Sequence, residues 1–464
     1  MPYRPTMAIE RSFRPPSFWL DELSDTVEPR APLARDASVD VAIVGAGFTG
    51  LWAAYYLVTQ NPELRIAIVE SEIAGFGASG RNGGWCQSHH TGVEQWLKGA
   101  KRAGAIAMQR AMFDTVDEVG RVAAAEQIRC DYAKSGQLAV STTESGCKRI
   151  RALLAELHRN GFSDSDYRFL DASECDARVR MAGARGGVYS PHSAAVQPAK
   201  LARGLAESVE RRGVAIYERS PARSLAPGVV TTDRGRLHAR IVLRCTEGYT
   251  RNLPGMEREL LPLHSLMIAT EPLSDAIWKQ IGAADRVLFG DVRRLLTYAQ
   301  RTADGRIALG AGVRYFYGSE IRDYFSPGPE FASTQQALAD YFPMLRDVEI
   351  THRWGGPLGV PRDAKPFVRF DARSGMGSAG GYTGSGVAAA NLAGRTLADL
   401  VGGRDTERTA YPWVDHRSPV WEREPLRWIG ANAALRMGAA ADRGESRGRP
   451  ARWRAALFDR ASGH

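Results

Sequence analysis

A glycine-rich turn near the N-terminus constrains the fold more than any other feature of this 464-residue chain. The stretch VAIVGAGFTG, residues 41–50, places Gly45, Gly47 and Gly50 between an apolar strand-like run and a helical one. In the spacing G-x-G-x-x-G, the first glycine makes the tight turn and the second admits a pyrophosphate against the backbone. The third lets the helix pack close to the strand. The pattern predicts a dinucleotide at the N-terminus of the helix, where free N–H groups and the positive dipole end meet the phosphates.

An acid ends the next predicted strand, LRIAIVE, at Glu70. A carboxylate in this position accepts hydrogen bonds from ribose hydroxyls and disfavours a ribose that bears a 2′-phosphate. A glycine turn alone is weak evidence, because small-residue turns are common. Strand, turn, helix, second strand and acid in register predict a dinucleotide site rather than a structural turn.

Two further glycine-dense stretches indicate which dinucleotide is bound. GFGASGRNGG, residues 75–84, follows the acid and offers N–H donors suited to a pyrophosphate or a flavin edge; its alternative is a flexible surface loop. GGYTGSGVAAANLAGRTLADLV, residues 380–401, is a second glycine turn that opens a second helix. An NAD dehydrogenase needs one such turn, whereas a second helix N-terminus would stabilise the negative charge of a reduced flavin.

Charge and composition exclude several other classes. Hydrophobic residues are 44% and charged residues 24%, as in soluble globular enzymes, and the net charge of +9 is concentrated in residues 417–464. No nucleic-acid-binding module or basic aromatic stripe accompanies that charge, so no nucleic-acid partner is expected. The five cysteines show no metal-ligand spacing, and no signal peptide or membrane-spanning run is apparent. We therefore expect no metal and a cytoplasmic location.

The pattern of strands and helices predicts an α/β fold with an α+β second domain. Strand-like runs separated by turns between Pro262 and Ala311 predict an antiparallel sheet inserted into a discontinuous Rossmann-like domain, as in glutathione-reductase-like FAD/NAD(P)-binding folds. In a polar leader, PPSFWLDEL carries Trp19 and Leu20 as possible anchors. The predicted division is a leader of residues 1–38, a nucleotide domain of 39–95, 189–261 and 350–405, a substrate domain of 96–188 and 262–349, and a basic helical tail of 406–464.

These motifs resemble the D-amino-acid oxidase and glycine oxidase family of FAD enzymes, and within it the γ-glutamylputrescine oxidoreductase branch. The resemblance rests on VGAGFTG, GASGRNGG, VQPAKLARGL, RCTEG, MIATEPL, RWGG and GGYTGSGV, and on the leader SFWLDEL and the tail EPLRWIGANAALR. It covers nearly the whole chain and is more specific for FAD and fold than for substrate. It implies these cofactor-binding residues: Gly45, Gly47, Phe48, Thr49, Gly50, Glu70, Ser71, Ala78, Ser79, Gly80, Arg81, Asn82, Gly83, Gly84, Ala222, Thr246, Gly248, Gly381, Tyr382, Gly384, Ser385, Gly386 and Val387.

Three departures from relatives that resemble sarcosine oxidases shape the expected chemistry. Ala388 stands where those relatives carry a lysine that grips the substrate carboxylate. No cysteine for covalent flavin attachment follows RWGGPLGVPRDAK, and the RIALGAG strand lacks their lysine for oxygen activation. We therefore expect non-covalent FAD and an extended amine substrate, such as a polyamine derivative, rather than a small amino acid.

The resemblance implies oxidation of a C–N bond, with hydride transfer from the α-carbon of a neutral amine to flavin N5 and hydrolysis of the imine. O2 or another molecule would accept the electrons. His264 and Tyr298 are the catalytic candidates; a buried structural imidazole and a half-buried strand tyrosine are the alternatives. His89, His90 and Cys86 follow the flavin loop but are expected to be structural or solvated.

Two other functions stay open at this stage, as does the role of the tail. The chain could be an NAD-dependent dehydrogenase with one Rossmann unit, or a flavin-holding partner protein without its own turnover. In the tail, helical spacing of apolar residues predicts short amphipathic helices with narrow apolar faces. We expect Trp428 and Trp453 to dock on the enzyme's own surface, so membrane contact is disfavoured. The oligomeric state is not predicted.

Overall fold

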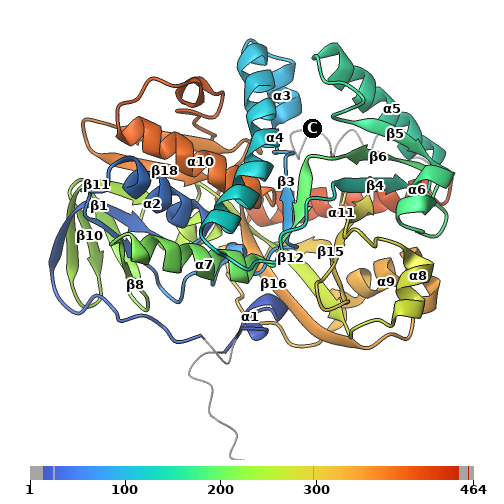
Figure 1. Cartoon of the computed structure of the whole chain (residues 1–464), viewed down its shortest axis with the longest axis horizontal. Coiled ribbons are helices and arrows are strands. Elements are labelled where there is room, and N and C mark those ends of the chain that lie inside the picture. Colours follow the sequence, from blue (N-terminus) through green and yellow to red (C-terminus); the bar gives the residue numbers. More distant parts are fainter. Residues whose placement is uncertain (1–13, 24–26, 296, 449–457, 459–464) are drawn as a thin grey trace, which may run out of the picture.

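A computed structural model describes residues 14–23, 27–295, 297–448 and 458 of the chain. Two large sheets dominate it (Figure 1). The first, the nucleotide sheet, has the strand order β17-β18-β11-β1-β2-β8, and β10 and β9 extend from β11. Its strands are β1 (Ala37–Val44), β2 (Ile66–Val69), β8 (Ala215–Tyr217), β9 (Ala222–Ala226), β10 (Val229–Thr232), β11 (Arg236–Arg244), β17 (Phe367–Asp371) and β18 (Met376–Gly380).

The centre of the nucleotide sheet is parallel. β1 lies between β11 and β2, with Val44 level with Arg244 on one side and with Val69 on the other. β18 runs parallel to β11 and β8 runs parallel to β2, so five strands end at the same edge of the sheet. Ligands of open parallel sheets bind beyond the carboxyl ends of the strands, so this edge is where a nucleotide is expected.

Two helices that follow glycine turns pack together on one face of this sheet. They are α2 (Phe48–Gln60) and α10 (Gly386–Val401), whose buried residues share one apolar core. A Cβ at Gly394 of α10 would lie 2.7 Å from Cβ of Trp52, so glycine is required for this close approach. The opposite face is covered by the β9–β10 hairpin, which contributes Val230 and Leu225 to a second apolar cluster.

The second sheet has the order β16-β12-β15-β14-β13-β4-β6-β5 and is antiparallel except for the parallel pair β13–β4. Leu266, Ile268 and Phe289 belong to the apolar core of this sheet, to which the helix α9 (Ala332–Tyr341) also contributes. The strands are β4 (Gln137–Ser141), β5 (Arg168–Asp171), β6 (Gly186–Ser190), β12 (Leu261–Thr270), β13 (Leu288–Asp291), β14 (Thr297–Arg301), β15 (Ile307–Arg314) and β16 (Ile350–Val360). This arrangement confirms the predicted α/β fold with an inserted, sheet-based second domain.

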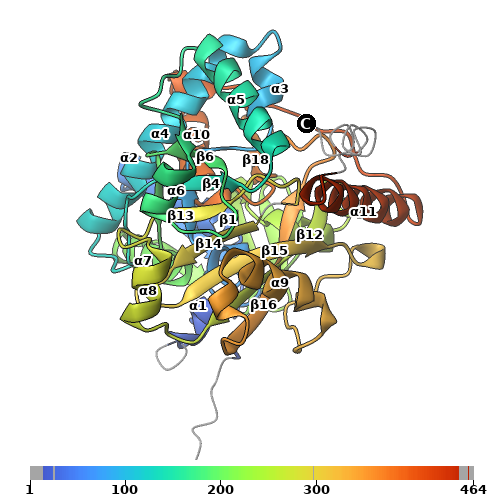
Figure 2. The ribbon, with the colours of Figure 1, turned by 90° about the vertical axis from the view of Figure 1, so that its right-hand side faces the viewer.

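The remaining elements connect the two sheets or lie on their outer surfaces (Figures 1 and 2). A small sheet pairs β3 with β7. These elements are α1 (Phe18–Asp21), β3 (Trp85–Gln87), α3 (Val93–Leu97), α4 (Arg102–Ala125), α5 (Glu144–Arg159), α6 (Ala172–Arg178), β7 (Ser193–Ala195), α7 (Pro198–Arg211), α8 (Asp275–Ile281) and α11 (Leu426–Ser446).

Two elements lie differently from the predicted division into domains. β16 was assigned to the nucleotide domain, but it pairs with β12 along its length, from Leu261↔Val360 to Thr270↔Ile350. α4 was assigned to the substrate domain, but its buried side chains, among them Met108, Met112 and Val116, belong to the apolar core of α2 and α10. Both elements carry apolar faces whose partners lie far away in the sequence.

Candidate cofactor and substrate site

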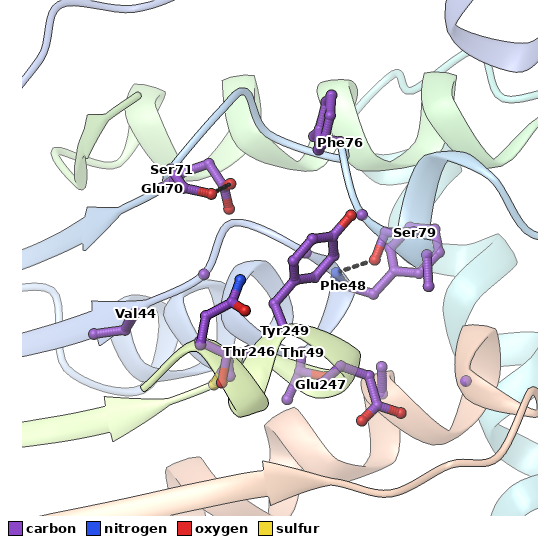
Figure 3. Close-up of a pocket in the computed structure, with 18 of the residues that line it drawn as sticks. Val44, Phe48, Thr49, Glu70, Ser71, Phe76, Ser79, Thr246, Glu247 and Tyr249 are labelled. Carbon is purple, nitrogen blue, oxygen red and sulfur yellow. Dashed lines mark hydrogen bonds between the residues drawn. The ribbon is translucent and has the colours of Figure 1, made fainter. Parts of the chain in front are cut away.

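A cavity lies at the carboxyl edge of the nucleotide sheet (Figure 3). Its empty volume, including the opening to solvent, is about 1300 Å³. The first turns of both α2 and α10 line it, through Phe48 and Thr49 on one side and Gly386 and Val387 on the other.

The first glycine turn has the backbone geometry that its spacing predicts. Gly45 adopts φ +104°, and a Cβ there would lie 2.5 Å from the carbonyl oxygen of Cys245 at the end of β11. A Cβ at Gly50 would lie 2.0 Å from the carbonyl oxygen of Gly45. Gly47 lines the cavity, and the Phe48 N–H beyond it donates to Ser79 Oγ at 2.8 Å. The turn therefore brings the backbone of α2 to the cavity wall.

Glu70 lies at the end of the cavity that is distant from the Phe48–Ser79 pair. Its Oε2 accepts from the Ala46 N–H at 2.8 Å, and its Oε1 accepts from the Glu72 N–H at 3.0 Å and from Ser71 Oγ at 3.2 Å. Burial raises the pKa of the Glu70 carboxyl, and these hydrogen bonds act in the opposite direction. In Figure 3 Glu70 and Ser71 lie together, away from the Phe48–Ser79 pair, as expected of a ribose contact at one end of an extended cofactor.

Side chains from other segments donate hydrogen bonds to the carbonyl groups of the glycine-dense loop, residues 75–84. Ser17 Oγ donates to the Gly80 oxygen at 2.7 Å, and Trp19 Nε1 donates to the Asn82 oxygen at 2.7 Å. Trp354 Nε1 of β16 donates to the Arg81 oxygen at 2.8 Å. Trp19 is 1% exposed, so the leader is anchored on the body as predicted, and its anchor supports the candidate cofactor loop.

A buried carboxyl braces the second glycine turn. Glu247 follows β11 and lines the cavity; its Oε2 accepts from the Gly381 N–H and its Oε1 from the Tyr382 N–H, each at 3.1 Å. A Cβ at Gly359 would lie 2.4 Å from Oε2, so β16 has room for this side chain only because it carries glycine there. Burial raises the pKa of Glu247 to about 7, against the effect of the two backbone donors.

The predicted cofactor residues fall into two groups. Those that line the cavity are Gly45, Gly47, Phe48, Thr49, Glu70, Ser71, Ala78, Ser79, Asn82, Ala222, Thr246, Tyr382, Gly384, Gly386 and Val387. Those that do not line it are Gly50, Gly80, Arg81, Gly83, Gly84, Gly248, Gly381 and Ser385. Several of the second group support the walls: Gly50 packs on Gly45, and Gly248 packs on the backbone of Pro357.

Arg81 has protein partners instead of a free guanidinium in the cavity. Its Nε donates to the Phe76 oxygen at 2.7 Å, and its Nη2 pairs with the Asp323 carboxylate at 3.1 Å. Asp323 also accepts from the Tyr249 hydroxyl at 2.5 Å. Tyr249 lines the cavity, and in Figure 3 its ring extends toward Phe76 and Ser79. Sequence patterns give no signal for Tyr249 or Asp323, which lie outside the quoted motifs, and Glu247 lies within RCTEG but is not among the residues predicted from it.

His264 lies away from the cavity, contrary to the sequence prediction. It is 0% exposed, its Nε2 accepts from the Arg322 N–H at 3.0 Å, and its ring packs on Phe316 and Phe325. Burial lowers the pKa of this imidazole to about 4, so it is neutral at pH 7. Neighbouring Leu266 lies in the core of the second sheet, the side away from the glycine loop. His264 is therefore a buried imidazole with a structural role, and its ring does not contact the cavity.

Tyr298 lies against the glycine loop and, like His264, is not among the residues that line the cavity. A Cβ at Gly83 would be 2.5 Å from its ring, and one at Gly310 would be 2.2 Å from it, so both positions leave room for the phenol. The hydroxyl is 2.7 Å from Ser265 Oγ of β12, and the ring meets Trp85 edge-on at 6.0 Å between centroids. Tyr298, Ser265, Trp85, Gly83 and Gly310 form what we call the Tyr298 cluster, which contains no charged side chain.

The other candidates near the loop have structural surroundings. Cys86 is fully buried, and burial raises the pKa of its thiol. Burial lowers the pKa of His90 to about 4, and His89 is 4.0 Å from Glu94. All five cysteines are free and buried, and the described residues contain no group of His, Cys, Asp and Glu suited to a metal ion.

The fold and the cavity define a flavin-type dinucleotide oxidoreductase. Two helix N-termini and an acid line one elongated space, and the Thr49 hydroxyl is 3.1 Å from that of Tyr382, which joins the two turns. These residues fit FAD: Glu70 would meet the ribose, the α2 turn the pyrophosphate and the α10 turn the flavin. A family model described as FAD dependent oxidoreductase (DAO) matches residues 40–400, so the chain belongs to the DAO family of FAD-dependent oxidoreductases. The NAD-dehydrogenase alternative is therefore wrong.

Individual relatives agree with this assignment. The chain is 29% identical over 387 residues to the gamma-glutamylputrescine oxidoreductase of Escherichia coli (strain K12), covering 82% of this chain and 87% of that protein. It is 28% identical over 390 residues to the probable oxidoreductase OrdL of Haemophilus influenzae, covering 81% and 85%. The solved glycine oxidase of Geobacillus kaustophilus superimposes with a TM-score of 0.68 at 19% identity, over 82% of this chain and 99% of that one.

Proposed function

We propose that the protein oxidises the C–N bond of an amine, an amino acid or a polyamine derivative, with non-covalently bound FAD. The bound flavin would take the hydride from the α-carbon, and the imine would be hydrolysed to an aldehyde and an amine. The similarity to a gamma-glutamylputrescine oxidoreductase over most of both chains supports an amine substrate.

The observation that carries the proposal is the uncharged surface of the second sheet beside the glycine loop. Burial raises the pKa of Tyr298, and the hydrogen bond with Ser265 partly offsets this, so its phenol is neutral at pH 7. An uncharged, partly buried surface favours the neutral form of an amine over its ammonium form. The lone pair of the neutral amine is what oxidation requires. We infer that the Tyr298 and Ser265 hydroxyls orient this amine.

The residue at position 388 argues for an extended substrate. Ala388, the position of the lysine in relatives that oxidise sarcosine, is 1% exposed and belongs to the apolar core. No cation can reach a substrate carboxylate from this position, and a carboxylate buried without a cation is costly. An amine whose charged groups are distant from the reacting carbon avoids that cost. Glycine, sarcosine and D-alanine cannot avoid it.

Flavin bleaching under argon with a panel of amines tests the proposal. We expect polyamine derivatives to reduce the flavin faster than sarcosine, glycine or D-alanine. Faster reduction by sarcosine would overturn the extended substrate, and no bleaching by any amine would favour a flavin-holding protein without turnover. Tyr298→Phe should slow reduction, whereas Tyr189→Phe, a half-buried tyrosine on β6 that donates to the Ser135 oxygen, is the matched control and should not.

A further inference from the structure

The C-terminal helix α11 is attached to the enzyme by its acidic residues. Asp442 accepts from the Arg294 and Leu295 N–H groups at 3.0 and 3.1 Å. Glu445 pairs with Arg149 at 2.6 Å and with Arg294 at 2.8 Å. These are the only two acidic residues in the sequence of α11, and both are directed toward the second domain. Figure 2 shows the helix at the periphery of the molecule.

The outer face of α11 is apolar near its start and basic further along. Leu426 is 67% exposed, Ile429 53% and Trp428 36%, and Tyr317 beside them is 61% exposed, with its ring 6.3 Å from that of Trp428. We use the name outer face for Tyr317, Leu426, Trp428, Ile429, Arg436 and Arg443. Large apolar side chains gathered on a surface mark an interaction site more often than single ones do.

Among the described residues, no carboxylate neutralises the basic part of the outer face. Arg436 and Arg443 are exposed, and neither has a carboxylate within 4.0 Å among the described residues. With both acids of the helix directed inward, its solvent side carries only positive charge. Arg436 and Arg443 lie seven positions apart, two helical turns, so their side chains extend on the same side.

We propose that the outer face binds the surface of an anionic phospholipid bilayer, with α11 lying in the plane of the interface. Arginines would meet lipid phosphates, and Trp428 and Tyr317 would lie at the headgroup level where aromatic rings with a polar edge are enriched. Leu426 and Ile429 would enter the acyl boundary. Among the described residues no helix is long and apolar enough to cross a membrane, which agrees with binding in the plane.

A second copy of the chain fits this face less well. A parallel two-fold pairing of α11 would bring the same arginines of both copies together, and an antiparallel pairing would place Arg443 opposite apolar residues at the start of the helix; in neither does an acid of the helix offset Arg436 and Arg443. The proposal departs from the expectation that Trp428 docks on the enzyme's own surface: Trp428 does contact Tyr317, but Leu426 and Ile429 remain exposed. Trp453 lies outside the described residues.

Vesicle sedimentation of the FAD-loaded full-length protein tests the proposal. We expect it to pellet with vesicles of phosphatidylcholine and phosphatidylglycerol, to stay in solution with phosphatidylcholine alone, and to be released by salt. Each arginine near an anionic surface contributes about 1 kcal/mol, so the double variant Arg436→Gln, Arg443→Gln should bind about 30-fold more weakly. Leu426→Ser should weaken binding about tenfold through lost apolar burial.

Matched variants and one further measurement separate the outcomes. Arg234→Gln with Arg404→Gln removes the same charge from exposed sites elsewhere and should leave binding unchanged. Equal losses in both double variants would show that net charge, not the outer face, drives sedimentation, and would overturn the proposal. Absence of binding to anionic vesicles would overturn it too, as would a concentration-dependent dimer that Ile429→Ser dissociates. Unchanged flavin absorbance and melting temperature would show that the variants are folded.

Discussion

Replacing Glu247 by glutamine should change how stability depends on pH. The carboxyl lines the cavity and holds the Gly381 and Tyr382 N–H groups at 3.1 Å each, with its pKa raised to about 7 by burial. Glutamine has one acceptor oxygen, so it satisfies one of these donors and leaves the other unpaired. The unpaired N–H group lowers the free energy of unfolding by about 1–3 kcal/mol. This loss is the same at every pH, so it can be distinguished from the effect of ionisation.

The magnitude of the pH-dependent part follows from the two pKa values. The folded protein keeps a proton on Glu247 that the unfolded chain, with its ordinary value of 4.5, releases as pH rises. The stabilising contribution is therefore complete below pH 4.5 and is lost as pH rises through 7. At about 1.4 kcal/mol for each pH unit, the loss amounts to about 3 kcal/mol. Glu247→Gln has no ionisable group at this position, so its stability should not show this loss.

Thermal melts of the apoprotein from pH 5 to pH 8 provide the assay. The melting temperature of the wild type should fall relative to that of Glu247→Gln across this range by about 2–3 °C, since an unfolding entropy of about 2.1 cal/mol/K per residue makes 1 kcal/mol correspond to about 1 °C in a chain of 464 residues. Glu207→Gln, an exposed glutamate on α7, is the matched control and should run parallel to the wild type. A constant difference between wild type and Glu247→Gln at every pH would refute the reasoning.

Three further outcomes are expected. Glu70→Gln should raise the Kd for FAD about 10- to 100-fold, since it weakens a charge-assisted hydrogen bond to the ribose, while an unchanged Kd in a flavin fluorescence titration would show that Glu70 is not at the ribose. Asp323→Asn should speed FAD release, because Tyr249 and Arg81 would lose their shared carboxylate partner. Equal release rates of the wild type and the variant in a stopped-flow displacement assay would count against this role of Asp323. Acid precipitation should leave all flavin in the supernatant, because no cysteine stands in or after RWGGPLGVPRDAK, residues 353–365; a yellow pellet would contradict it.

The parts of the site that sequence predicts are those fixed by local spacing. The turn at Gly45, Gly47 and Gly50 and the acid at Glu70 need only a strand, a turn and a helix in order, and the structure places Gly45, Gly47 and Glu70 in the cavity wall. The second turn, at Gly384 and Gly386, is local in the same way. Short-range chemistry determines these positions, so they can be recognised without knowledge of distant neighbours.

The parts that sequence does not predict depend on registry and on long-range contacts. The side on which His264 lies is set by the alternation of β12, whose pairing with β16 keeps one register from Leu261 to Ala269. The sequence shows that neighbouring side chains of a strand lie on opposite faces, but not which face meets the glycine loop. Tyr249 reaches Asp323 across 74 residues of sequence, and no periodicity signals such a pair.

The strand order of the nucleotide sheet has a consequence for how the protein is made. β1 leaves the ribosome early, but the edge it offers to β11 stays unpaired until residues 236–244 are synthesised. The other edge of β11 in turn lacks its partner until β18, residues 376–380, is synthesised, and the α10 turn follows β18 in the sequence. A nascent chain that ends before β18 therefore has an open sheet edge and lacks the second glycine turn of the cavity. Such edges are prone to pair with other chains. Flavin capture thus requires β18 and the α10 turn to be synthesised, and translation that stops before β18 releases a product that chaperones must protect or proteases remove.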